Sequence, residues 1–149
     1  MTWLRAHSKR ERGQALVEFA FVGIIFFILV FGMIDVGRAV WNYNTLAEAT
    51  REGTRYAIVH GGNSLDPSGP GSPYYTAPDS DTMVTANVEK FTSGMGDVLL
   101  TVKSEWIDGD NQSGSRVKVT SSYAFEPMFD FLGIVSFNIS SSSTMVITN

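Results

Sequence analysis

The sequence predicts an α+β protein in which one long N-terminal helix packs on a small antiparallel β-sheet, with one short helix in addition. Three observations predict this fold. An apolar run without charge extends from Phe19 to Ile34, and no proline interrupts its continuation to His60. Three segments between residues 98 and 147 alternate apolar and polar positions. With 149 residues, the chain is long enough for one ordinary domain.

The apolar run is the candidate membrane span. Its sixteen residues would extend roughly 24 Å as a helix, whereas a hydrocarbon core needs about 20 residues. Extension back to Ala15 supplies the missing length, so the predicted span covers about residues 15–34 and includes Glu18 near one end. The large apolar residues of this span are Phe19, Phe21, Ile24, Ile25, Phe26, Phe27, Leu29, Phe31 and Ile34.

Charge is distributed unevenly around this span. The net charge is −4, but residues 1–13 hold four cations and one acid, whereas the chain from Ala57 onward holds four cations and ten acids. Between residues 35 and 49, Arg38 is the only cation. The positive-inside rule therefore places a basic leader, residues 1–13, in the cytoplasm and the acidic body outside it. This polarity is typical of a single-pass membrane protein, and we expect no nucleic-acid partner.

A cleaved secretory signal peptide is the alternative interpretation of the apolar run. Its basic and apolar regions are both present, but its cleavage site is not. Asp35 and Arg38 follow the run, and no small-x-small pattern stands at the expected distance. The sequence therefore favours a retained helix, predicted over residues 14–60.

The second half of this helix is two-faced. One predicted face is apolar or small and needs cover, and the other is polar. The first comprises Ala39, Tyr43, Leu46, Thr50, Gly53 and Ala57, and the second Arg38, Asn42, Thr45, Glu48, Glu52 and Arg55.

A break follows the helix, because residues 61–78 hold four of the five prolines and predict a loop without regular strands. Residues 79–149 are predicted to form an extracytoplasmic short helix and a three-stranded sheet. Ser80-Asp81 has the form of an N-cap and Gly94 that of a stop. The short helix should bury Val84, Val88 and Phe91. In each of the three strands, alternate residues should share one face of the sheet. These residues are Val98, Leu100, Val102, Ser104 and Trp106 in the first strand, Val117, Val119, Ser121, Tyr123 and Phe125 in the second, and Phe137, Ile139, Ser141, Ser143, Met145 and Ile147 in the third.

The stretch from Gly13 to Phe19 carries the chemistry. A carboxylate such as Glu18 is unfavourable near a membrane boundary and marks a functional position by default. One interpretation is that Glu18 reaches the headgroups. The other is that a cut between Gly13 and Gln14 makes Glu18 the fifth residue of the mature chain. The new α-amino group of one subunit would then pair with the carboxylate of the next, and the cut would remove the basic leader.

The sequence resembles the TadE-like proteins of the tight-adherence (Flp-type) pilus system. The resemblance lies in GQALVEFAF at 13–21, in AEATREGTRYA at 47–57 and, more weakly, in RVKVTSSYAFEP at 116–127 and SSSTM at 141–145. Between the first two segments it also includes Gly32, Asp35, Gly37 and Arg38.

The resemblance implies a pilin-like fold and a minor pilin or pseudopilin role in pilus assembly, with adhesion as the downstream process. It implies cleavage after Gly13 by a prepilin peptidase, with Glu18 and Phe19 in the recognition motif. The implied partners are that peptidase, other pilin or pseudopilin subunits, an inner-membrane assembly platform and the bacterial cytoplasmic membrane. Glu18-Phe19 stands where the major pilin usually has Glu-Tyr, which favours a minor component. Gly23 stands where family members often have proline.

Other functional classes find little support in the sequence. The chain has no cysteine, and its histidines, His7 and His60, fall in different predicted compartments. The loop from Asp108 lacks the ligand spacing of a calcium loop. We therefore expect no metal site, no cofactor and no enzymatic activity. The alternative function is a non-polymerising, single-pass envelope protein whose extracytoplasmic head binds a ligand or acts as a scaffold.

Overall fold

A computed structural model describes residues 4–77, 79–95, 100–128 and 136–149; for residues 4–12 and Ala77 it describes the backbone alone. The chain divides into two compact units. One comprises residues 1–38 with 127–134, and the other residues 39–126 with 135–149. Val98, expected in the first strand, lies outside the described residues.

The helix α1 (Leu4–Val59) contributes to both units, which divide it after Arg38. It starts ten residues before the expected start at Gln14. Residues 4–12 contain neither proline nor glycine, so the local sequence offers nothing that would end the helix there. At the other end, Gly61 and Gly62 follow closely, as is common at helix C-termini.

The second unit contains the predicted antiparallel sheet, formed by β3 (Leu100–Trp106), β4 (Arg116–Phe125) and β5 (Phe137–Val146) in that order. Alternate residues are buried along β4 as expected, and Ser104 and Trp106 are buried in β3. Phe137 was expected to be inward-facing but is exposed. It pairs with Phe125 at the end of the β4–β5 ladder, on the edge strand β5, which has a paired neighbour on one side only.

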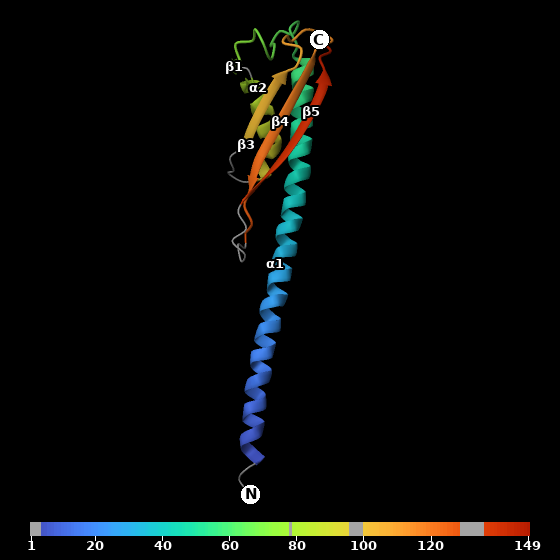
Figure 1. The fold of residues 1–149 in the computed structure, drawn as a ribbon. Helices are drawn as coiled ribbons and strands as arrows, with labels where there is room; N and C mark the ends of the chain where they lie inside the picture. Colours follow the sequence, from blue (N-terminus) through green and yellow to red (C-terminus); the bar gives the residue numbers. More distant parts are fainter. Residues whose placement is uncertain (1–3, 78, 96–99, 129–135) are drawn as a thin grey trace. The chain divides into compact units, whose positions relative to one another are not determined.

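The inner face of this sheet is covered by the second half of α1 and by α2 (Thr82–Thr92) (Figure 1). Two predictions about α1 were wrong: Asn42 is buried and Tyr43 is exposed. Asn42 Nδ2 donates to the Tyr123 hydroxyl over 3.1 Å, so a polar side chain can be buried here without losing its hydrogen bond. On α2, Val84 and Val88 are buried as expected, whereas the prediction for Phe91 was wrong, because its side chain is exposed. Within residues 13–59 of α1, the buried residues are Asn42, Leu46, Ala49, Thr50, Gly53, Thr54 and Ala57.

The proline-rich segment is more ordered than its composition predicts. The prediction of no regular strand in residues 61–78 was wrong, because β1 (Tyr75–Ala77) pairs with β2 (Ser80–Asp81). The Tyr75 ring packs edge-on against Trp106, with 5.4 Å between ring centroids. Gly69, at φ +86°, lies directly against the same indole, where no Cβ would fit. Tertiary contacts to Trp106 therefore order a segment without periodicity of its own.

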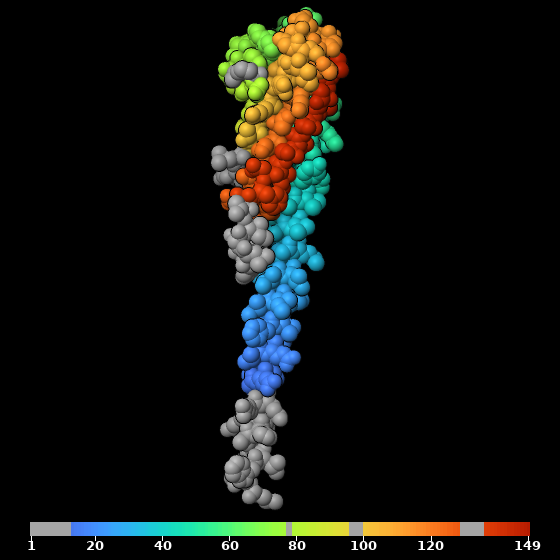
Figure 2. All heavy atoms as spheres, viewed as in Figure 1, coloured from blue at the N-terminus to red at the C-terminus, as the bar shows by residue number. Residues whose placement is uncertain are grey.

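The outer face of the sheet is polar. Figure 2 shows β4 and β5 uncovered on this side. Exposed or half-buried serine and threonine side chains alternate here with the buried residues of the inner face, which is the pattern of an antiparallel sheet with one solvated face. The outward-facing residues include Thr101, Lys103, Lys118, Thr120, Ser122, Ser140, Ser142 and Thr144.

Candidate processing and assembly site

The predicted processing site lies on an exposed stretch of α1. Every residue from Gly13 to Val22 is exposed, and the exposed fraction reaches 76% at Phe19. Among the described residues, Glu18 has no hydrogen-bond or ion-pair partner. The carboxylate lies on the exposed surface of the helix.

Gly13 has no packing role within the described part of the chain. A Cβ added at Gly13 would have no other atom within 4 Å, and the same holds for Gly23. A glycine inside a helix lowers its stability by roughly 0.5–1 kcal/mol relative to alanine. Because Gly13 lies within α1, it weakens the helix at the predicted scissile bond, and a peptidase would need to unwind the chain there.

The apolar half of α1 is the one helix in the described chain that is long and apolar enough to cross a membrane. Nearly all of its predicted span residues are exposed, and Phe31 is half-buried. Aromatic contacts occur along the helix, with the rings of Phe27 and Phe31 stacked at 6.0 Å between their centroids. Exposed aromatic and aliphatic side chains on this scale need a cover of lipid or of other apolar helices.

A charged pair marks the end of the apolar run. Arg38 Nη1 donates to Asp35 Oδ1 over 3.0 Å, one helical turn apart. The Asp35 side chain is only 13% exposed. The same oxygen accepts a hydrogen bond from the Met128 backbone N–H over 3.1 Å. The resemblance singled out Asp35 and Arg38, but the link to Met128 has no signal in the sequence.

Residues 47–57 of α1 pack against the sheet and α2. Gly53 faces α2, and an added Cβ would overlap Val88 Cγ2. Small buried side chains at Ala49, Thr50 and Ala57 complete this surface. Acids and bases of this segment form pairs three residues apart: Arg51 with Glu48 at 3.7 Å, both exposed, and the exposed Arg55 with the half-buried Glu52 at 3.2 Å.

Asp81 connects the proline-rich segment to α2. Its side chain is fully buried. One carboxylate oxygen accepts from the N–H groups of Met83 and Val84, over 2.9 and 3.1 Å, and caps α2. The other accepts from Gly69 N–H over 2.9 Å. The capping role was predicted from sequence, whereas the link to Gly69, twelve residues earlier, was not.

The loop that begins at Asp108 is held by an ion pair. Arg116 Nη2 lies 2.7 Å from Asp108 Oδ1, and the Arg116 backbone N–H donates to Asp108 Oδ2 over 2.8 Å. Hydrogen bonds from the Arg116 side chain and backbone lower the pKa of Asp108 from 3.8 to about 2. Asp108 therefore closes the β3–β4 hairpin. No cluster of three or more His, Cys, Asp or Glu residues that could hold a metal occurs in the described part of the chain.

The described residues have a pilin-like α+β arrangement. The N-terminal apolar helix is long enough for a single membrane span, and its second half packs on a small antiparallel sheet. Residues 13–55 match the family model of TadE-like proteins. Over these residues the chain is similar to TadE-like proteins. No curated protein and no solved structure gave a significant match.

Proposed function

We propose that this chain is a minor pilin or pseudopilin, a structural subunit that assembles a tight-adherence type pilus and has no catalytic role. It is held in the bacterial cytoplasmic membrane by the first half of α1, with the leader in the cytoplasm and the head outside. A prepilin peptidase removes the leader after Gly13. The processed helix then docks with other pilin or pseudopilin subunits at an inner-membrane assembly platform.

One observation carries this proposal. The family match begins at Gly13 and includes Glu18, and both residues lie on a fully exposed stretch of helix without a packing role in the described chain. A purely structural anchor needs neither a glycine nor a carboxylate at these positions. Both residues have a use if the chain is cut there and paired with another subunit.

Electrostatics favours a pair between the α-amino group of one processed subunit and the Glu18 carboxylate of the next. A carboxylate within a bilayer is unfavourable by about 2.5–3.5 kcal/mol at the centre, and by less near an end. Cleavage creates an α-amino group at Gln14 and makes Glu18 the fifth residue of the mature chain. When the amine of one subunit meets the Glu18 carboxylate of the next, each neutralises a charge that the apolar surroundings disfavour. Loss of the basic leader frees the helix for extraction, because the leader is what the positive-inside rule retains in the cytoplasm.

The mature N-terminus tests the processing step. The full chain is expressed in a host with a prepilin peptidase, and its intact mass is measured. We expect a chain that begins at Gln14. Gly13→Val should abolish processing, whereas Gly23→Val, an equally open glycine of the same helix, should leave it unchanged. A wild-type chain that still begins at Met1 in this host would overturn the proposal and favour the non-polymerising envelope protein.

A further inference from the structure

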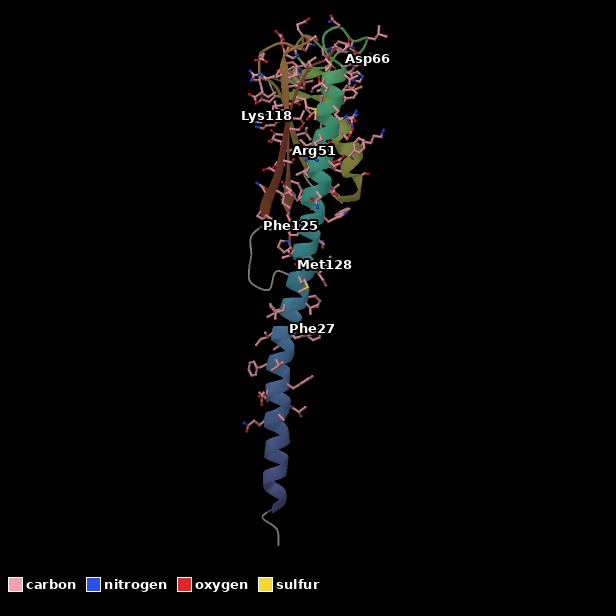
Figure 3. The ribbon with its side chains drawn as sticks, turned by 90° about the vertical axis from the view of Figure 1, so that its right-hand side faces the viewer. Phe27, Arg51, Asp66, Lys118, Phe125 and Met128 are labelled. Carbon is pink, nitrogen blue, oxygen red and sulfur yellow. The ribbon has the colours of Figure 1, made fainter. Side chains whose placement is uncertain are left out.

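The chain returns to the apolar half of α1 directly after β4. Pro127 and Met128 group with residues 1–38. The backbone N–H of Met128 donates to Asp35 Oδ1 over 3.1 Å. Asp35 directly follows Ile34, the last residue of the apolar run. Met128 thus lies at the level of α1 where the span ends, and Figure 3 shows it beside the helix.

Asp35 can occupy a membrane boundary because its charge is compensated. Its carboxylate accepts hydrogen bonds from the Arg38 guanidinium and from the Met128 N–H. Pairing and hydrogen bonding reduce the cost of bringing an ionised group close to hydrocarbon. The level of Asp35 is therefore compatible with the headgroup region, and so is the chain segment bound to it.

Met128 presents apolar surface at this level. Its side chain is 61% exposed, and Met33 and Val36 on α1 are 77% and 64% exposed. These side chains continue the exposed apolar surface of the span. The sequence that follows, residues 129–135, reads FDFLGIV and contains one acid. Burial of a methionine side chain away from water is favourable.

We infer that the chain contacts the bilayer a second time, through Met128 at the extracytoplasmic interface, with Asp35 as the anchor of this contact. The occupant is lipid, because the exposed side chain adjoins the surface that the proposed span presents to lipid. The inference rests on the proposed membrane topology. It gives the subunit a contact that must break when the helix is extracted into a polymer.

A spin label tests this contact in the full chain. The sequence has no cysteine, so Met128→Cys gives a single attachment site. The labelled protein is placed in liposomes of phosphatidylcholine and phosphatidylglycerol, and the accessibility of the label to oxygen and to a water-soluble nickel complex is compared. Leu29→Cys on the span is the lipid control, and Ser142→Cys on the outer face of the sheet is the water control.

We expect the label at Met128 to favour oxygen, as the label at Leu29 does. Preferential accessibility to nickel, as at Ser142, would overturn the inference, and so would protection from both reagents, which indicates cover by protein. A nickel-accessible label at Leu29 would instead overturn the membrane span itself. The two failures are therefore distinguishable.

Asp35→Ala tests the anchor. It removes the acceptor of the Met128 N–H, so the label at Met128 should become more accessible to nickel while the label at Leu29 stays unchanged. Asp35→Asn keeps an acceptor oxygen and should largely preserve the wild-type pattern. An unchanged label at Met128 in the Asp35→Ala chain would overturn the role of Asp35.

Discussion

Single buried polar groups order much of the head. Asp81 binds Gly69 through one carboxylate oxygen and caps α2 through the other, so one side chain connects two segments that share no periodicity. A buried donor that loses its acceptor destabilises the fold by about 1–3 kcal/mol. The ordering of the proline-rich segment therefore depends on a few such contacts.

Asp81→Ala should lower the free energy of unfolding by about 2–4 kcal/mol, because it removes a helix cap and leaves the Gly69 N–H without its acceptor. Asp81→Ser keeps the cap and should cost about half as much. Chemical denaturation of the detergent-solubilised chain, followed by tryptophan fluorescence, measures both. An Asp81→Ala chain as stable as the wild type would contradict the assigned role.

Asp108 gives the hairpin a pH dependence at low pH. Its pKa is lowered to about 2, so the pair with Arg116 contributes its full stability above the ordinary value of 3.8 and loses it as the pH falls through about 2. Carboxyl NMR shifts should report a midpoint near 2. Arg116→Gln should raise the pKa toward 3.8, whereas Lys118→Gln should leave it nearly unchanged; equal effects would refute a specific pair.

At the scale of elements, the two halves of α1 differ in the side chains that they expose and bury. Large exposed apolar side chains occupy its first half, whereas several alanine, glycine and threonine residues are buried in the second. Small residues let the sheet and α2 approach the helix backbone closely. The 47–57 segment is therefore explained by packing in the head, independently of its place in the family motif.

Gly53→Ala tests this packing. The added methyl group would overlap Val88, so the free energy of unfolding should fall by about 1–3 kcal/mol. Val88→Ala in the same chain should relieve the overlap, and the double variant should be more stable than the sum of the single effects predicts. Additive effects in chemical denaturation would show that Gly53 and Val88 do not compete for the same space.

At the scale of the whole molecule, the proposed assembly depends on a charge that has no partner in the described chain. Glu18→Gln should leave membrane insertion intact but reduce cross-linking between processed subunits by roughly tenfold or more, corresponding to about 1.4 kcal/mol or more. Glu18→Asp, which keeps the charge, should retain more cross-linking. The mature N-terminus of each variant is measured in parallel, so that an assembly defect is separated from a processing defect.

The sequence by itself determined the apolar helix, the inward faces of β3 and β4, the N-cap at Asp81 and the similarity of residues 13–55 to TadE-like proteins. These features depend on local periodicity, capping chemistry and a contiguous motif. Only the tertiary structure decided that Asn42 is buried against Tyr123, that the proline-rich segment packs on Trp106 and that Met128 binds Asp35. Each of these contacts joins residues far apart in the chain, and its stability comes from burial and hydrogen bonding that no local pattern encodes.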